Sequence, residues 1–223
     1  ETMYRQALEI NPSNARILCM LGKVLKAMEV FDEALKMLQA ALLQNAQSAL
    51  IHSELGDIYR LMHRPHEAMA HLITGLELAP DSSFIHQTMG RFFASHHQLE
   101  RAASHYRTSL TSDPANQEAM IEVAEVYEKL GRHGHALRQY KRALEMSPDD
   151  PDVHSRLIRL YCKMPDAPPK ALSDATMRWA QSQRSTSASI TRLYPNSRLP
   201  GRQLKVGYLC SPEERPTRRF SIE

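Results

Sequence analysis

One residue pattern recurs along this chain at a fixed interval of 34 residues. Each copy has a small residue in its first half, an aromatic or leucine three positions later, and an alanine followed by a second small residue in its second half. The four copies are Leu21-Gly22, Leu25, Ala34, Leu38 and Ala41; Leu55-Gly56, Tyr59, Ala68, Leu72, Gly75 and Pro80; Met89-Gly90, Phe93, Ala102, Tyr106, Ser109 and Pro114; and Val123-Ala124, Tyr127, Ala136, Tyr140, Ala143 and Pro148. Small residues at two fixed places let two antiparallel helices approach closely, while larger side chains fill the space between neighbouring pairs. The sequence therefore predicts a stack of helical pairs.

The period and the residue types resemble the tetratricopeptide repeat family, whose unit is a helix-turn-helix of 34 residues. The resemblance implies an all-α fold, a tetratricopeptide α-solenoid that winds as a right-handed superhelix. A single pair has too little core of its own, and stacked pairs bury one another's apolar faces. The tryptophan that the family carries early in the first helix is replaced here by Leu18, His52, His86, Met120 and His154.

The repeat register divides the first two thirds of the chain. Residues 1–14 are predicted to be the second helix of a preceding repeat, because Tyr4, Ala7 and Pro12 occupy second-helix positions. We therefore expect the natural protein to carry further repeats upstream. Residues 15–150 hold four repeats, with predicted bounds at 15–48, 49–82, 83–116 and 117–150.

After residue 150 the pattern weakens and then changes. Residues 151–185 are predicted to be a degraded fifth repeat, in which Ile158 replaces the small residue and Trp179 is expected to plug the last interface. Residues 186–202 contain two prolines and a glycine, which favours a linker. Residues 203–223 begin with good strand formers, so a new domain is predicted to start there.

Composition and charge exclude several classes of protein. No apolar run approaches the roughly 20 residues of a membrane span, and no signal peptide opens the chain, so we expect a cytoplasmic protein with no membrane partner. Of the net charge of +3, seven Lys or Arg against three Glu lie after residue 184, which leaves the repeats nearly neutral. A neutral array is not expected to bind nucleic acid. Cys19, Cys162 and Cys210 are predicted to be free thiols.

The junction after the repeats resembles a second family. Three segments carry this resemblance: Arg178-Trp179-Ala180, Pro195-Asn-Ser-Arg198 and Gly201-Arg-Gln-Leu-Lys-Val-Gly-Tyr-Leu-Cys-Ser-Pro212. In this order they are similar to the segment that joins repeats to the catalytic region in the SPINDLY/O-GlcNAc-transferase family, glycosyltransferase family 41. The resemblance implies a protein O-glycosyltransferase that moves a sugar from a nucleotide donor to Ser or Thr. Its donor site would lie between two Rossmann-like lobes, of which only the first strand is present.

Two features depart from that family. Its histidine after the first strand is absent from Ser211 to Phe220, and its asparagine ladder is replaced by Met20, Glu54, Thr88, Glu122 and Arg156. We expect no catalytic residue and no cofactor within this fragment, with a nucleotide sugar implied for the full-length protein. The alternative is a non-enzymatic tetratricopeptide scaffold or co-chaperone-like adaptor.

The first helices of the repeats are predicted to form the concave face, which would bind an extended protein or peptide. One position per repeat on that face reads Lys23, Asp57, Arg91, Glu125 and Arg159, and the further candidates for partner binding are Glu54, Arg60 and Gln87. The alternating signs fit either a self-compensating solvated ridge or a stripe that reads a peptide. A clamp for acidic C-termini is not expected, because Asp57 and Glu125 would repel such a ligand.

Several of the eleven histidines gather at predicted turns: His63, His66, His96, His97, His133 and His135. Equivalent turns of successive repeats lie about one helix diameter, about 10 Å, apart, which is too far for two repeats to share one metal ion. No metal site is therefore predicted.

Overall fold

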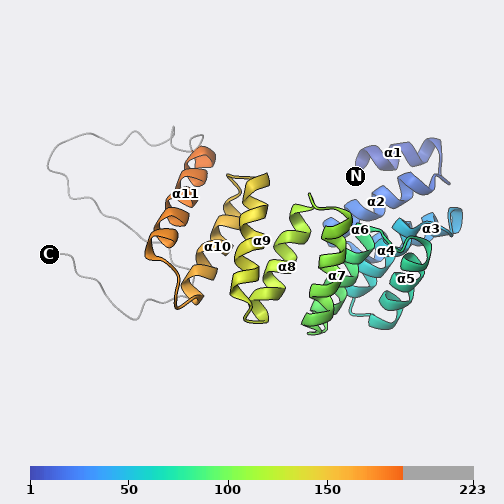
Figure 1. Ribbon diagram of the computed structural model, residues 1–223. Coiled ribbons are helices and arrows are strands. Elements are labelled where there is room, and N and C mark those ends of the chain that lie inside the picture. The colour runs from blue at the N-terminus through green and yellow to red at the C-terminus, as the bar shows by residue number, and fades with distance from the viewer. Residues whose placement is uncertain (188–223) are drawn as a thin grey trace, which may run out of the picture. The chain divides into compact units, whose positions relative to one another are not determined.

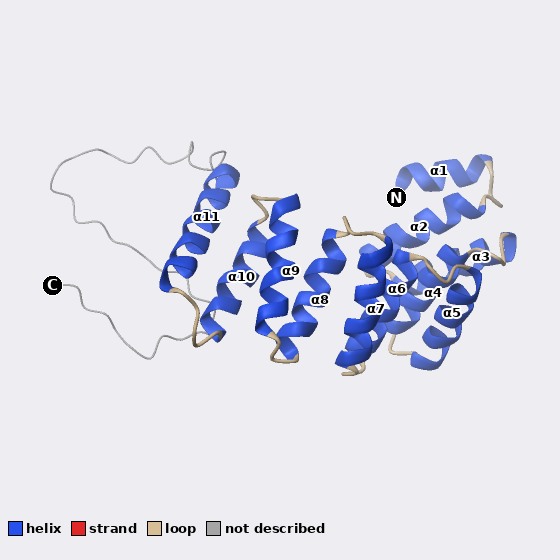
Figure 2. Cartoon of the chain, in the orientation of Figure 1, coloured by secondary structure: helices blue, strands red, loops and turns tan. Residues whose placement is uncertain are grey.

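The computed structural model describes residues 1–187, and within them every regular element is an α-helix (Figure 2). The helices are α1 (Thr2–Ile10), α2 (Ala15–Ala27), α3 (Phe31–Gln44), α4 (Ala49–Leu61), α5 (Pro65–Leu78), α6 (Ser83–Ser95), α7 (Leu99–Ser112), α8 (Gln117–Lys129), α9 (His133–Met146), α10 (Pro151–Lys163) and α11 (Pro169–Ser187). They pack in chain order as a helical stack, which confirms the all-α solenoid (Figure 1). The strand predicted within 203–223, and the linker beyond Ser187, lie outside the described residues.

Close contact within each pair depends on the small residue of the first helix. A Cβ atom added to Gly56 of α4 would lie 2.6 Å from Cγ of Leu72 in α5. At Gly90 of α6 it would lie 2.7 Å from the ring of Tyr106 in α7. Real Cβ atoms do not come this close, so glycine is required for the observed separation of the helices. Leu72 and Tyr106 are buried as a result.

The turn within each of the first four pairs has the same backbone conformation. Its central residue has a positive φ of 57° to 70°, at Glu29, His63, His97 and Gly131, one repeat apart. The backbone N–H of the residue after it donates to the carbonyl five residues earlier, as from Arg64 to Tyr59 at 2.8 Å. This hydrogen bond and the left-handed residue together cap the first helix. The equivalent position of the last pair is Pro165, whose ring fixes φ near −65°. That turn therefore cannot form, and α10 ends at Lys163, followed by Met164 in an extended conformation.

The turns between pairs carry side-chain caps. Asn14, Ser48, Asn116 and Asp150 stand at equivalent positions of their repeats and accept hydrogen bonds from N–H groups of the helix that follows. Prolines precede several of these caps and keep the second helices from continuing.

The last pair is packed more loosely than the others. Ile158 is half-buried in α10 at the small-residue position. With one inserted residue counted in the longer turn between α10 and α11, Ala175 stands where Leu72, Tyr106 and Tyr140 fill the earlier pairs. A pocket of about 380 Å³ lies beside Ala175, between α9, α10 and α11. Trp179 is half-buried in α11, and its indole N–H is buried with no acceptor among the described residues.

Candidate functional site

Buried ion pairs join the first helices α2 and α4. Lys26 Nζ donates to Glu54 Oε2 at 2.6 Å and to Asp57 Oδ2 at 2.8 Å. Lys23 Nζ lies 3.3 Å from Glu54 Oε1, and Arg60 donates to Asp57 Oδ1 at 2.7 Å. The side chains of Glu54 and Asp57 are 0% and 5% exposed. Both carboxylates are therefore hidden beneath the cations that neutralise them.

The pKa values of this cluster show that the charges are compensated. Burial opposes ionisation of Asp57, yet the charges of Lys26 and Arg60 more than offset it and lower the pKa of Asp57 below its usual value. Burial likewise opposes the charge on Lys26, but Asp57 and Glu54 raise its pKa. Both groups are therefore ionised in the folded protein at neutral pH.

A second cluster joins α6 to α8. Arg91 Nε donates to Glu122 Oε1 at 2.5 Å, and its guanidinium lies 2.8 Å from Glu118 Oε1. Gln87, which is buried, donates to both carboxylates and accepts from Asn116 Nδ2 at 2.9 Å. Burial opposes the charge on Arg91, but Glu122 and Glu118 raise its pKa. Glu118 remains 69% exposed, so this part of the face presents negative charge.

A third cluster joins α8 to α10. Arg156 pairs with Glu125, and Lys163 Nζ donates to Glu128 Oε2 at 2.9 Å. Tyr140 of α9 also donates its O–H to Glu128, at 2.7 Å. Glu128 is thereby held from two sides and only 6% of its side chain is exposed.

The ion pairs between first helices run in a register different from the predicted series. Lys23 meets Glu54, Arg91 meets Glu122 and Glu125 meets Arg156, in each case 31 residues away rather than 34. Other ion pairs between first helices join residues 28 or 35 apart, as Lys26 with Glu54 and Lys163 with Glu128, because long side chains reach neighbours up to about a turn to either side. Within the described helices, no pair of neighbours in the series Lys23, Asp57, Arg91, Glu125 and Arg159 forms a salt bridge. Glu54, Glu122 and Arg156, the positions of the replaced asparagine ladder, supply the partners instead.

The predicted binding residues therefore fall into two groups. Glu54, Asp57 and Gln87 are buried and join helices to each other. Four others line pockets on the face of the first helices, and Lys23 is half-buried on α2 beside Glu54: the four are Arg60, Arg91, Glu125 and Arg159. Lys26, Lys129 and Lys163 were missing from the prediction, because the 34-residue series selects one residue per repeat and these lie one turn further along each helix.

Two adjoining pockets form a groove along the first helices. One of about 430 Å³ lies between α4, α6 and α8, lined by residues that include Arg60, Arg91, Ser95, Tyr106 and Glu122. The other, of about 400 Å³, lies between α8 and α10. Glu125 and Lys129 line both pockets, so the two lie next to each other. They are called the first-helix groove below.

Histidine pairs were also missed by the sequence analysis. Nε2 of His52 lies 3.1 Å from the Ala46 carbonyl, and Nδ1 lies 3.0 Å from Nδ1 of His71. His86 and His105 repeat this arrangement one period later, at 2.9 Å to Pro80 and 3.1 Å between rings. A carbonyl only accepts, so Nε2 of His52 and of His86 donates, and the neutral ring leaves Nδ1 as acceptor for the second histidine. Each pair thus links the two helices of a repeat to the preceding turn.

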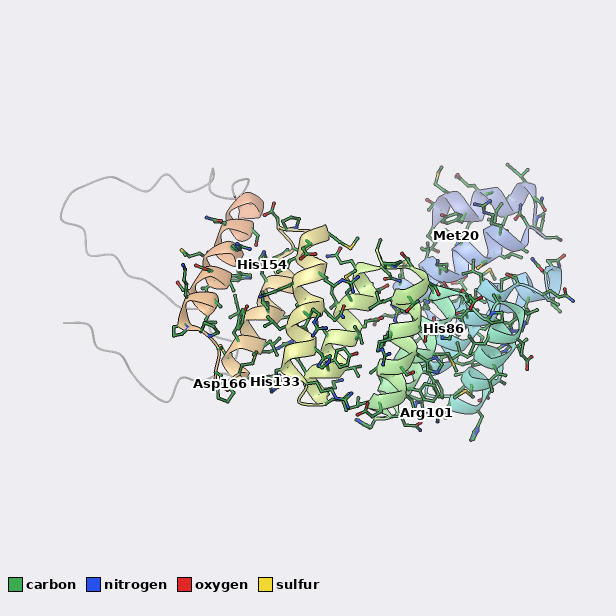
Figure 3. All side chains as sticks on the ribbon, in the orientation of Figure 1. Met20, His86, Arg101, His133, His154 and Asp166 are labelled. Atoms are coloured by element: carbon green, nitrogen blue, oxygen red, sulfur yellow. The ribbon has the colours of Figure 1, made fainter. Side chains whose placement is uncertain are left out.

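The third such histidine, His154, is only half satisfied. Its Nε2 donates to the Pro148 carbonyl at 2.7 Å, while its Nδ1 is buried with no hydrogen-bond partner among residues 1–187. Figure 3 labels His86 on α6 and His154 on α10. It also shows Arg101, His133 and Asp166 along the lower edge, where the turns within pairs lie. The signal for the pairs was present as histidines 34 residues apart, but their partners lie 19 residues away on the second helix.

The described residues hold no cluster of three or more His, Cys, Asp or Glu side chains that could bind a metal ion. Cys19, which is buried, and Cys162, which is exposed, are free thiols, and burial raises the pKa of Cys19. None of the helices within residues 1–187 is long and apolar enough to cross a membrane.

Two tetratricopeptide repeat family models match the sequence, over residues 1–53 and 118–160. These two segments carry tetratricopeptide repeats. No curated protein matched the sequence. Solved structures with the same fold include PilF of Pseudomonas aeruginosa, at 18% identity and a TM-score of 0.67 over 82% of this chain and 93% of that one. The tetratricopeptide protein TTC0263 of Thermus thermophilus matches at 22% identity and a TM-score of 0.66, covering 71% and 87%. The tetratricopeptide protein YrrB matches at 17% identity and a TM-score of 0.57, covering 85% and 98%. At these identities the likeness concerns the fold of the repeats.

Proposed function

We propose that the repeats bind a partner protein through a segment that lies extended in the first-helix groove. The observation that carries the proposal is that the two pockets adjoin, share Glu125 and Lys129, and are lined by charged side chains of successive first helices. A row of adjoining polar pockets suits a backbone that runs across several repeats, with each repeat contacting a different part of it. The structural neighbour YrrB is described as having an unusual peptide-binding site, which is consistent with this use of the fold.

The test is to fill the groove. Ser95→Trp adds a large side chain at the pocket between α6 and α8, whereas Thr108→Trp adds the same side chain on the exposed surface of α7. Peptides selected on the wild-type protein from a random dodecapeptide display library should lose at least about tenfold in affinity for Ser95→Trp, equivalent to about 1.4 kcal/mol. They should bind Thr108→Trp normally. Equal binding to both variants, with helical circular dichroism intact, contradicts the groove.

We further propose that this module belongs to a protein O-glycosyltransferase and presents acceptor proteins to a catalytic region. The support is the sequence resemblance of Arg178-Trp179-Ala180 and residues 195–212 to the junction of glycosyltransferase family 41. In this role the module supplies acceptor binding, and the nucleotide sugar binds elsewhere in the full-length protein. A fold shared by many functions does not by itself select the transferase.

A non-enzymatic scaffold or co-chaperone-like adaptor is an equally supported context for the same groove. The two are separated by the reading frame that encodes the chain and by assay of its full-length product. Transfer of a labelled sugar from a nucleotide donor to protein Ser or Thr supports the transferase. An unrelated downstream domain, or absence of transfer with a range of nucleotide sugars, supports the scaffold.

A further inference from the structure

The pocket between α8 and α10 carries more positive than negative side chains. It is lined by four cations and two carboxylates: Lys129, Arg156, Arg159 and Lys163, with Glu125 and Glu128. These six charged side chains all line one pocket of about 400 Å³, so their fields add within it.

Both carboxylates of this pocket already have partners within the protein. Glu125 is paired with Arg156, and Glu128 accepts from Lys163 and Tyr140. Only 6% of the Glu128 side chain is exposed, so it offers little negative charge to a ligand.

Two cations of the pocket are left over. Lys129 and Arg159 are exposed, and neither forms an ion pair or hydrogen bond through its side chain with any residue in the described part of the chain. At the α2–α4 end of the face, by contrast, Lys23, Lys26 and Arg60 all contact a carboxylate. Uncompensated positive charge in the groove is thus concentrated between α8 and α10.

We propose that this pocket is an anion subsite of the first-helix groove, in which Lys129 and Arg159 bind the carboxylate of an acidic side chain of the partner peptide. The inference rests on the proposed peptide-binding function and specifies the chemistry of its ligand. A guanidinium and an ammonium can both donate to one carboxylate, and such charge-assisted hydrogen bonds are stronger than neutral ones. Asp57 and Glu125, which were expected to repel an acidic ligand, are both neutralised by internal partners.

A peptide carboxylate fits this surface better than a nucleic acid. The adjoining pocket presents Glu118, whose side chain is 69% exposed and lies on α8, the helix that also lines the proposed subsite. A polyanion lying along the groove would meet that charge, and phosphate recognition needs a continuous series of cations. A peptide can place a single acidic side chain at the subsite and neutral or basic residues beside Glu118.

The test uses a random dodecapeptide display library on the full chain and on two double variants. Lys129→Gln with Arg159→Gln removes the free cations, and Lys36→Gln with Arg138→Gln makes the same change of charge on exposed positions of α3 and α9. Peptides selected by the wild type should be enriched in Asp and Glu. Their affinity should fall about tenfold for the groove variant, which corresponds to about 1.4 kcal/mol, and remain within about twofold for the control.

The outcomes separate the subsite from the function on which it rests. Peptides that bind without acidic enrichment, or that lose equal affinity in both double variants, overturn the subsite and leave groove binding intact. A library that yields no binder overturns both. Tighter binding of a random-sequence 20-nucleotide RNA than of any selected peptide, lost in the groove variant, assigns the cations to nucleic acid and also overturns the proposal.

Discussion

Between α2 and α7 the polar side chains that join helices are buried and paired, whereas between α8 and α11 several equivalent groups are exposed or lack a partner. Glu54 and Asp57 are hidden under three cations, while Arg156 and Glu125 are 33% and 37% exposed. His52 and His86 are satisfied at both ring nitrogens, while His154 is satisfied at one.

The same helical pattern therefore serves two purposes. In a repeat stack each pair contacts only its neighbours, so one part can be optimised for packing while another leaves polar groups available for a ligand. In the first pairs a glycine lets the two helices pack closely, whereas in the last pair a pocket lies beside Ala175. The contrast predicts that equivalent substitutions will have unequal effects in the two halves.

The largest difference is expected for the ion pairs. Lys26→Met leaves the buried Glu54 and Asp57 with only Lys23 and Arg60 as partners, and should lower the free energy of unfolding by about 3 kcal/mol. Arg156→Met removes the partner of Glu125 at an exposed site and should cost less than about 1 kcal/mol. Urea unfolding followed by circular dichroism measures both. Equal losses would show that burial does not distinguish the two halves.

A smaller difference is expected for the glycines. Gly90→Ala places a Cβ 2.7 Å from the Tyr106 ring and should destabilise the protein by about 1–3 kcal/mol, because neither α6 nor the ring has room to move apart. Gly134→Ala, in the first turn of α9, meets no atom within 4 Å. That change should be neutral or stabilise the helix by about 0.5–1 kcal/mol. A Gly90→Ala protein as stable as the wild type would mean that the pair can open without loss.

The contacts between helices show how much of the structure could be predicted from the sequence. The helical pairs could be predicted because the positions that let helices approach, such as Gly56 and Gly90, repeat visibly along the chain. The pairing of Arg91 with Glu122 could not, because it depends on how neighbouring helices and their long side chains meet in three dimensions, which a period of 34 does not specify. His71 and His105 were missed for the same reason, since their role requires the alignment of two antiparallel helices.

The candidate site was predicted in part. Lys23, Arg60, Arg91, Glu125 and Arg159 lie on the face of the first helices, but burial removes Glu54 and Asp57 from direct contact with a ligand. Which cations lack a partner depends on distances in three dimensions, so Lys129 could not be singled out from the sequence.

The histidine pairs should make the first half of the stack sensitive to acid. Burial, and the repulsion that a second positive charge would meet within each histidine pair, lower the pKa of His71 and His105, with Arg101 also acting on His105. In the unfolded chain the pKa of a histidine is about 6.5, so below that pH the unfolded state binds more protons than the folded state does. Stability should fall as the pH drops below about 7 toward the lowered pKa values.

The control for this response is His71→Gln with His105→Gln, because the glutamine amide can still donate a hydrogen bond but does not titrate. Thermal unfolding at pH 7.5 and pH 5.5 should show a smaller decrease in midpoint for the double variant than for the wild type. If both lose the same amount, the pH dependence originates in other histidines.

The smallest effect is expected for a substitution that gives His154 a histidine partner on α11. Allowing for the inserted residue, Asp174 of α11 occupies the position of His71 and His105, and it lines the same pocket as His154. In Asp174→His the new Nδ1–H can donate to the unpartnered Nδ1 of His154, and one added hydrogen bond should raise the free energy of unfolding by about 1 kcal/mol. Ser173→His places the same ring at the adjacent exposed position and should have no such effect.

The gain should also disappear below about pH 6, because two protonated rings cannot share one hydrogen bond. A gain that is equal in both variants, or independent of pH, would mean that the looser packing of α11, and not the missing donor, distinguishes the last pair from the first.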